Sequence, residues 1–412
     1  MPEYYDGLET REPGERERSL MAALPGQIAH ARHSASGWTR ILAEVDPAAV
    51  TGRAALAKLP VTRKSDLIAL QKAERPLGGL NATPFERLGK VFVSPGPIYD
   101  PEGRGRDWWR TARALFAAGF RAGDLAVNAF AYHFTPAGSM LESGALALGC
   151  TVVPSGTGQT EMQVATIADL RASAYIGTPS FLKLIVEKAD ELKADIGCLK
   201  RAAVGAEFLP PALRAAMGER GIHVLQSYAS ADLGLIAYES EALEGMILDE
   251  GLILEIVRPG TGDVLPEGEI GEVVITTFNA DYPLIRFGTG DLSAVLPGAS
   301  PCGRTNTRIR GWMGRADQTT KVKGMFVHPS QVAEVVKRHS EILKARLVVD
   351  SSEGGDRMTL RCETQGAAPP GLARAIADSI REITRLRGEV ALAKPGELPN
   401  DGKVIEDARK YA

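Results

Sequence analysis

The 412-residue sequence has few cysteines and no long apolar segment. Its four cysteines are Cys150, Cys198, Cys302 and Cys362, and no two of them form a Cys-x-x-Cys pair, which excludes a disulfide framework in a chain of this length. No apolar run approaches the roughly 18 residues of a membrane-spanning helix, and the charged N-terminal segment lacks the apolar core of a secretory signal. We therefore expect a cytoplasmic protein with no membrane partner.

Neither sign of charge is in excess. Lys and Arg total 48 and Asp and Glu total 51, a formal net charge of −3, so no overall field attracts nucleic acid or anionic lipid. Apolar residues make up 44% and charged residues 24%, which is typical of a globular protein. The length favours two or three domains, most simply one large and one small.

Short apolar runs alternate with helical patterns between residues 90 and 240. This alternation predicts parallel βαβ units, whose ligands bind beyond the carboxyl ends of the strands. The expected strands are 91–94, 125–131, 151–156, 174–178, 201–207 and 223–229.

The pattern changes twice after residue 240. Residues 250–312 are rich in strand patterns separated by Gly and Pro, which indicates an antiparallel subdomain. Beyond residue 329 come a helix, two strands, a helix and a strand, which predict a compact α+β unit of about 90 residues. The expected fold class is α/β, with a large N-terminal domain of mostly parallel sheets plus a strand-rich subdomain, and a small C-terminal α+β domain.

A series of motifs resembles the phenylacetate–CoA ligase branch of the adenylate-forming enzymes. In order they are LPVTRKSDL, VGAEFLPP (204–211), QSYASADLG (226–234), IRFGTGDLS (285–293), PCGRT (301–305), GRADQTTKVKGMFVHPSQVAEVV (314–336) and GKVIEDAR (402–409). Each motif is weak alone, but together they span nearly the whole chain. The resemblance implies an AMP-binding adenylation domain over 1–314 and a mobile C-terminal domain over 315–412.

This resemblance also implies the reaction and its cofactors. The family joins a carboxylic acid to AMP and then passes the acyl group to a thiol, usually that of coenzyme A, and it uses ATP and Mg²⁺. Asp291 is similar to the aspartate that accepts hydrogen bonds from both ribose hydroxyls, although a turn aspartate is the alternative. The other implied nucleotide-binding residues are Ser94, Gly96, Gly205, Ala206, Glu207, Ser227, Tyr228, Ala229 and Arg315.

Lys403 resembles the lysine whose ammonium enters the site during adenylation. Asp232 stands where the family usually has a Glu that helps to hold Mg²⁺, and Arg315 resembles an arginine that contacts ribose or phosphate. Asp317 resembles the hinge residue. Lys323 and Gly324 resemble the segment that meets the acceptor thiol after the small domain rotates.

Tyr132, His133 and Phe134 lie where the family lines its acyl pocket. With the Pro-Ala-Gly that follows, they would form a flat, mostly apolar slot for an aryl or arylacetyl acid. A core histidine between two core aromatics is the alternative, because periodicity does not separate the two.

The phosphate loop departs from the family pattern. The corresponding segment, VSPGPIYDPEG (93–103), has no lysine and contains Pro95, Pro97 and Pro101, which have no N–H to donate. Such a loop should bind phosphate oxygens less well. Arg104 and Arg106 follow closely, and we expect their guanidinium groups to act in its place.

A second departure concerns zinc. Some members of this branch have a Cys and His site before the PCGRT segment, but here Cys302 stands alone and residues 238–250 contain neither Cys nor His. Because a structural zinc ion needs about four N or S ligands, we expect no structural zinc.

The sequence thus predicts an AMP-forming ligase that activates an aromatic or arylacetic acid and transfers it to coenzyme A. Its partners would be small molecules, with no nucleic acid, and a homodimer is the commonest assembly for such a chain. Two alternatives stay open. One is an adenylating enzyme whose acceptor is an amine or a carrier protein. The other is a non-catalytic homologue that binds nucleotide or acyl-CoA, which the altered phosphate loop favours.

Overall fold

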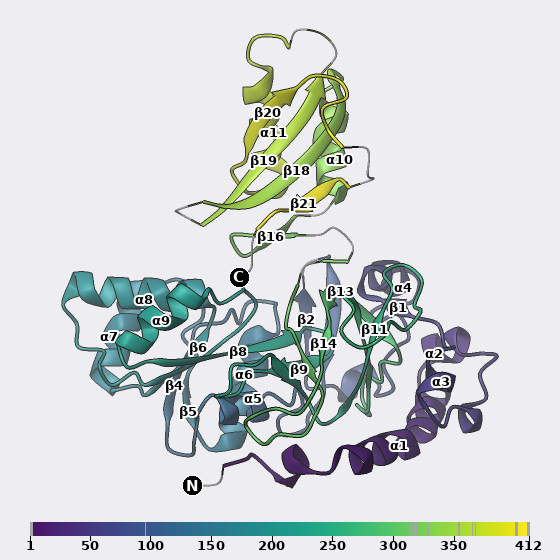
Figure 1. Cartoon of the computed structure of the whole chain (residues 1–412). Helices are drawn as coiled ribbons and strands as arrows, with labels where there is room; N and C mark the ends of the chain where they lie inside the picture. The colour runs from purple at the N-terminus through teal and green to yellow at the C-terminus, as the bar shows by residue number, and fades with distance from the viewer. Residues whose placement is uncertain are drawn as a thin grey trace. The chain divides into compact units, whose positions relative to one another are not determined.

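The computed structural model describes residues 3–94, 96–313, 315–316, 320–327, 329–352, 355–364, 366, 368–399 and 403–409. The chain divides into two compact units, Met1–Trp312 and Met313–Ala412 (Figure 1). The boundary expected from the sequence lies two residues later, between 314 and 315. Within the described ranges, no helix combines the length and the apolar character needed to cross a bilayer.

Helices dominate the first 75 residues. Helix α1 begins at Pro13, because proline suits the first helical turn and the Glu12 carboxylate accepts hydrogen bonds from the amides of Gly14 and Glu15. The helical elements before the central sheet are η1 (Gly7–Thr10), α1 (Pro13–Ser34), α2 (Ser36–Ile41), η2 (Pro47–Ala49), α3 (Arg53–Leu56), η3 (Lys64–Asp66), α4 (Leu67–Ala73) and η4 (Phe85–Arg87).

A nine-stranded sheet crosses the first unit in the order β14-β15-β10-β9-β8-β7-β6-β4-β5 (Figure 1). Its parallel part consists of β4 (Leu125–Asn128), β5 (Thr151–Val153), β6 (Ala174–Gly177), β7 (Arg201–Val204) and β8 (His223–Ser230). The helices of this region are α5 (Ala112–Ala117), α6 (Ala137–Leu148), α7 (Thr160–Leu170), α8 (Pro179–Leu192) and α9 (Pro211–Glu219). The antiparallel strands that extend the sheet are β9 (Gly234–Tyr238), β10 (Met246–Leu248), β14 (Val295–Leu296) and β15 (Arg308–Ile309).

Both faces of the parallel part are covered, and strand β6 shows how. Ala174 and Ile176 pack in a cluster with Leu115 of α5, whereas Tyr175 packs in a second cluster with Leu182 of α8. Successive side chains of a strand point to opposite faces, so one strand contributes to two cores. This is why the strand reads as a continuous apolar run.

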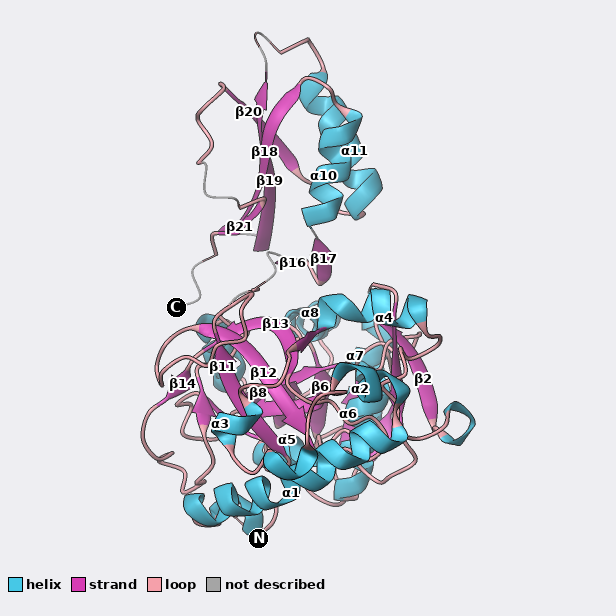
Figure 2. Cartoon of the chain, turned by 90° about the vertical axis from the view of Figure 1, so that its right-hand side faces the viewer, coloured by secondary structure: helices cyan, strands magenta, loops and turns pink. Residues whose placement is uncertain are grey.

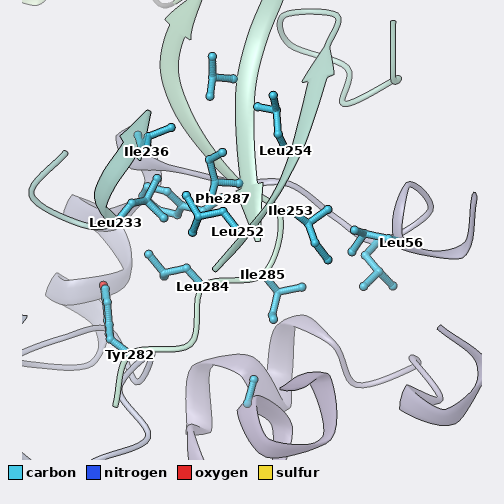
Figure 3. Close-up of a cluster of buried hydrophobic side chains, with 14 of the residues drawn as sticks. Leu56, Leu233, Ile236, Leu252, Ile253, Leu254, Tyr282, Leu284, Ile285 and Phe287 are labelled. Atoms are coloured by element: carbon cyan, nitrogen blue, oxygen red, sulfur yellow. The ribbon is translucent and has the colours of Figure 1, made fainter. Parts of the chain in front are cut away.

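A second sheet has the order β1-β13-β12-β11, with β1 (Thr62–Arg63), β11 (Leu252–Val257), β12 (Gly271–Thr277) and β13 (Phe287–Ser293). Figure 3 shows the apolar cluster beside it, where Leu252 and Leu254 of β11 lie near Phe287 of β13 and near Leu233, next to strand β9. This cluster joins the two sheets of the first unit. It therefore fixes strand β13 relative to the turn that contains Leu233.

Buried Arg286 anchors the start of β13. Its Nε donates to Glu255 Oε2 at 2.9 Å, Nη2 donates to the carbonyl of Gly262 at 2.8 Å, and Nη1 donates to the carbonyl of Ala57 at 2.8 Å. A buried charge is tolerated only when it is paired and hydrogen-bonded in this way. The arginine thereby holds β13 in place, and that strand carries Asp291 five residues later.

The second unit is built on a four-stranded sheet in the order β20-β19-β18-β21. Both of its helices lie on one side of that sheet (Figure 2). Its elements are β16 (Thr320–Val322), β17 (Met325–Val327), α10 (Pro329–Arg338), β18 (Ile342–Ser352), β19 (Gly355–Thr364), α11 (Leu372–Thr384), β20 (Glu389–Ala393) and β21 (Ile405–Asp407). The expected fold class, α/β with a small C-terminal α+β domain, is confirmed.

Candidate active site

The carboxylate of Asp291 is held at both oxygens by aromatic side chains. The Tyr228 hydroxyl, from β8, donates to Asp291 Oδ2 at 2.8 Å, and Trp312 Nε1 donates to Asp291 Oδ1 at 3.0 Å. The same tyrosine hydroxyl lies 3.4 Å from Thr289 Oγ1. Two other segments of the chain, at Tyr228 and at Trp312, therefore set the orientation of this half-buried carboxylate. A carboxylate has two acceptor oxygens, and each can accept more than one hydrogen bond.

The turn after β7 lies beside β8, the strand that carries Tyr228. Because Val204 of β7 pairs with Gln226 of β8, Gly205 comes next to Ser227, and a Cβ at position 205 would lie 3.2 Å from the Ser227 carbonyl oxygen. Gln226 Nε2 donates to the carbonyl of Glu207 at 2.7 Å. The structure thus brings two predicted groups together at the carboxyl ends of parallel strands, where α/β sheets bind ligands. They are Gly205, Ala206 and Glu207 on one strand end and Ser227, Tyr228 and Ala229 on the next.

Asp232 lies in the turn between β8 and β9, and its side chain is fully buried. The neighbouring Arg110 fixes this turn by donating to the carbonyl of Leu233 at 2.5 Å and to Asp249 Oδ1 at 2.9 Å. Gly234 has a φ of +74°, and a Cβ there would lie 2.7 Å from a carbonyl oxygen of Trp109. The turn passes close to the chain at Trp109, and its positive φ and lack of space suit only glycine.

Lys64 reaches the buried carboxylate of Asp232. Strand β1 pairs in parallel with β13, which places Lys64 at the start of η3, and its Nζ forms an ion pair with Asp232 Oδ2. About a quarter of the Lys64 side chain is exposed. The Lys64 ammonium therefore supplies this site with a positive charge, which the segment 93–103 does not provide.

The predicted phosphate loop forms the hairpin of β2 (Lys90–Ser94) and β3 (Ile98–Glu102). Gly96 is exposed in its turn, and Pro95 lies outside the described residues. Ser94 pairs with Ile98, so Asp100 is its diagonal neighbour on the same face, and both side chains are buried. The hairpin therefore contributes a hydroxyl and a carboxyl where the family pattern has a lysine.

Asp100 lies against Asp232 as well as Ser94. Burial and the negative charge of Asp232 raise the pKa of Asp100 to about 7, and the Lys64 ammonium acts in the opposite direction. Ser94 Oγ, Asp100 Oδ2 and Asp232 Oδ1 have no hydrogen-bond partner among the residues that the structure describes. Two buried carboxyls thus share one nearby ammonium group.

The arginines expected to replace the missing lysine are placed elsewhere. Arg104 is exposed and its Nε donates to the carbonyl of Arg87 at 3.2 Å, while Arg106 donates to the carbonyl of Ala147. Among the described residues, neither guanidinium group is hydrogen-bonded to the hairpin, whereas Lys64 pairs with the buried Asp232.

The proposed acyl-pocket residues lie on the loop after β4. Asn128 Nδ2 donates to the Tyr132 hydroxyl at 2.8 Å, and the Phe134 carbonyl accepts from the amide of Val93 at 2.8 Å. His133 is exposed and Phe134 is 77% exposed. The alternative of a core histidine between core aromatics is therefore wrong, and the pocket role stays a prediction.

The second unit carries the remaining residues named from the family motifs. Lys403 is exposed and precedes β21, while Arg315 is half-buried. Lys323 and Gly324 form the exposed turn between β16 and β17, where the Lys323 amide donates to Asp356 Oδ2 at 2.9 Å. The predicted hinge residue, Asp317, lies outside the described residues.

Comparison with known proteins supplies the family. Residues 108–279 match the model of the AMP-binding enzymes. The phenylacetate-coenzyme A ligase of Aromatoleum evansii is 32% identical over 375 residues, which cover 85% of this chain and 83% of that protein. The chain belongs to the phenylacetate–coenzyme A ligase family. The relative from Thermus thermophilus is 31% identical, and that alignment covers 99% of this chain and 100% of the relative.

The fold of this family member has a solved counterpart. A crystal structure of 2-hydroxyisobutyryl-CoA ligase, in complex with 2-HIB-AMP and CoA in the thioesterification state, superposes with a TM-score of 0.83. It is 23% identical and covers 99% of this chain and 93% of that one. This likeness shows the fold.

Sequence reasoning missed three residues of this ligase-family site, namely Lys64, Asp100 and Trp312. Two signals were present. The lysine stands within the LPVTRKSDL motif, and the aspartate is an acid inside a segment expected to meet phosphate. Trp312 had no comparable signal, because only the folded chain brings it to Asp291.

Zinc was expected to be absent from this family member. Cys302 Sγ lies 3.1 Å from Ser300 Oγ, and in the part of the chain that the structure describes no three His, Cys, Asp or Glu side chains are grouped to hold a metal ion. The absence of zinc stays a prediction, which metal analysis of the purified protein can check.

Proposed function

We propose that this chain is an ATP-dependent ligase that activates an aromatic or arylacetic carboxylic acid as acyl-AMP and transfers the acyl group to coenzyme A. The observation that carries this proposal is the Asp291 carboxylate of β13, oriented by Tyr228 of β8 and by Trp312. Four relatives at 30–32% identity, all phenylacetate-coenzyme A ligases, support the same activity.

Asp291 accepts both ribose hydroxyls in this proposal, since a carboxylate has two oxygens and suits a vicinal diol. Tyr228 keeps the carboxylate in that orientation. Gly205 has no side chain, so the turn lies close to Ser227, and in this proposal the adenine packs beside that turn. Together these contacts position the α-phosphate for attack by the carboxylate of the acid.

Mg²⁺ neutralises charge on the phosphates when it is bound, and hard oxygen ligands suit it. The residues present fit this ion, because Asp232 Oδ1 and Ser94 Oγ are buried oxygens without a hydrogen-bond partner in the described chain. Lys64, beside the same carboxylate, supplies a further positive charge for phosphate oxygens.

The second unit supplies the remaining groups. Lys403 stabilises the charge that develops on the attacking carboxylate and the α-phosphate, and Arg315 contacts ribose or phosphate. The unit then turns about Asp317, and the segment with Lys323 and Gly324 meets the thiol of coenzyme A. Support for these roles comes from the family motifs in which the residues stand.

The acid would lie against the loop of Tyr132, His133 and Phe134. An aromatic ring suits this loop because two of its three side chains are aromatic and the third is an imidazole. We further propose that the protein acts in the cytoplasm, on small molecules, as a homodimer.

One observation favours a second candidate, a homologue that binds nucleotide without turnover. The hairpin that should hold the β- and γ-phosphates presents the buried acid Asp100, and its turn contains proline. A carboxylate there repels phosphate unless a cation intervenes. Lys403 argues for catalysis, since a protein that only binds has no need of a cation in the transition state.

Pyrophosphate–ATP exchange with a panel of aryl and arylacetic acids tests the proposal. Exchange that depends on the acid, followed by thioester formation when coenzyme A is added, is the expected result. Exchange without thioester would indicate an amine or a carrier protein as the acceptor. Tight nucleotide binding without exchange for any acid would contradict the ligase and favour the second candidate.

Replacing Asp291 with asparagine should lower kcat/KM for ATP in the exchange reaction by about 10- to 150-fold. A hydrogen bond to a charged group contributes about 1.5–3 kcal/mol, and the amide keeps one acceptor oxygen but loses the charge. Tyr228→Phe, which removes one donor and keeps the ring, should cost less than about tenfold. An Asp291→Asn protein with an unchanged kcat/KM would show that the ribose is held elsewhere.

A further inference from the structure

We propose that Asp100 is a second carboxylate ligand for the divalent cation, so that Asp100 and Asp232 hold this cation before the nucleotide binds. This inference rests on the proposed function and concerns the same site. It adds one statement to that function, which is that the nucleotide-free protein already binds the cation. The cation then does not have to arrive with the nucleotide.

The geometry brings the two acids together from separate elements. Asp100 is on strand β3 and Asp232 is in the turn between β8 and β9, and their exposed fractions are 1% and 4%. Each carboxyl has one oxygen, Oδ2 of Asp100 and Oδ1 of Asp232, without a hydrogen-bond partner in the described chain. The Ser94 hydroxyl, buried on the same face of the hairpin, is likewise without one. The three buried side chains lie together, because Asp100 is next to both Ser94 and Asp232.

The charge at this position needs a cation. Two carboxylates carry −2 and the Lys64 ammonium carries +1, so the fully ionised group keeps a net charge of −1. ATP would bring several more negative charges to the same place, at an unfavourable electrostatic cost. A divalent cation between the carboxylates reverses the sign of the group to +1. Lys64 can then turn from Asp232 toward phosphate oxygens, and its partly exposed side chain leaves room for that change.

The number of ligands matches what Mg²⁺ prefers. This ion usually takes one or two carboxylates and completes six oxygen ligands with waters and substrate phosphates. Two carboxylates and a hydroxyl leave about three positions for such ligands. A complete protein cage would exclude phosphate, and within the described ranges no third acid or histidine joins this pair.

The opposing interpretation is that Lys64 and a proton shared between the acids already satisfy the pair. Asp100 would then be a structural residue, and the nucleotide would bring the cation with it. The two interpretations differ in whether the nucleotide-free protein binds the metal.

Mn²⁺ binding to the full-length protein, measured by electron paramagnetic resonance without nucleotide or acid, separates them. We expect one saturable site in the wild type. Changes in outer groups alone alter metal affinity by about 10–100-fold, so Asp100→Asn and Asp232→Asn should each weaken binding at least about tenfold. Asp195→Asn is the matched control, because Asp195 is an exposed acid of the same unit and should bind Mn²⁺ as the wild type does.

If the wild-type protein shows no saturable Mn²⁺ site, the inference is wrong. This outcome does not depend on whether the variants fold. An Asp100→Asn protein with wild-type affinity, or a loss of equal size in Asp195→Asn, also overturns the inference. The readout also separates this inference from the ligase proposal. Mn²⁺ binding that depends on Asp100 stands even if no acid supports exchange, whereas exchange by a protein without this binding refutes only the inference.

Discussion

Replacing Lys403 with alanine should slow acyl-adenylate formation by about 10²–10³-fold. Removing one preorganised positive or hydrogen-bonding group aimed at developing charge typically has an effect of this size. The loss should appear in kcat of pyrophosphate–ATP exchange rather than in nucleotide affinity, because the ammonium acts on charge that grows only in the transition state.

Two controls show whether the loss in Lys403→Ala is specific to acyl-adenylate formation. Lys394→Ala removes another exposed lysine of the same unit and should leave the exchange rate unchanged. Thioester formation from preformed acyl-AMP should be nearly normal in Lys403→Ala, because we propose that the second half-reaction uses the segment with Lys323 and Gly324 instead. An equal loss in both half-reactions would mean that the substitution damages the unit as a whole.

The sequence allowed the fold to be predicted because local patterns decided it. In β6 the alternation of Ala174, Tyr175 and Ile176 between two cores produces the apolar run by which the strand was recognised. Helix α1 has its start signal, Glu12 and Pro13, beside its first turn. Such signals involve neighbours in sequence, so one chain is enough to detect them.

The electrostatics of the site could not be predicted in the same way. Lys64 and Asp232 are 168 positions apart, and their ion pair exists because β1 docks on β13 while Arg110 fixes the β8–β9 turn. Sequence reasoning looked for a replacement cation near the loop and chose Arg104 and Arg106. The fold directs both of these to backbone carbonyls. Which charge meets which acid depends on tertiary packing, and no local pattern records it.

The contact of Trp312 with Asp291, at the end of the first unit, also depends on tertiary packing. The Trp312 indole donates to Asp291, which is 21 residues earlier, so the last residue of this unit contacts the carboxylate proposed to bind ribose. The IRFGTGDLS motif identified the aspartate, but the motif could not show what orients it. A motif thus predicts which residue acts, and the fold determines how it is held.

Replacing Asp100 with asparagine should stabilise the metal-free protein by about 4 kcal/mol at pH 8. Burial and the charge of Asp232 raise the pKa of Asp100 to about 7 in the folded protein, against 3.8 for an ordinary aspartate. Because the folded state binds this proton more tightly, the free energy of unfolding falls as the pH rises from about 4 to about 7. Each pKa unit corresponds to about 1.4 kcal/mol, and asparagine has no charge to bury.

Urea unfolding of both proteins between pH 5 and pH 8, with a chelator present, measures this difference. The gain should shrink as the pH falls toward 5, since the wild-type carboxyl is then protonated in the folded state. Asp195→Asn, an exposed acid, should show no comparable change with pH. A gain that is absent at pH 8, or that does not vary with pH, would mean that Asp100 is ionised and stably paired throughout. In that case the buried acids would have no unmet need for a cation, and Lys64 alone would balance the charge on which nucleotide binding depends.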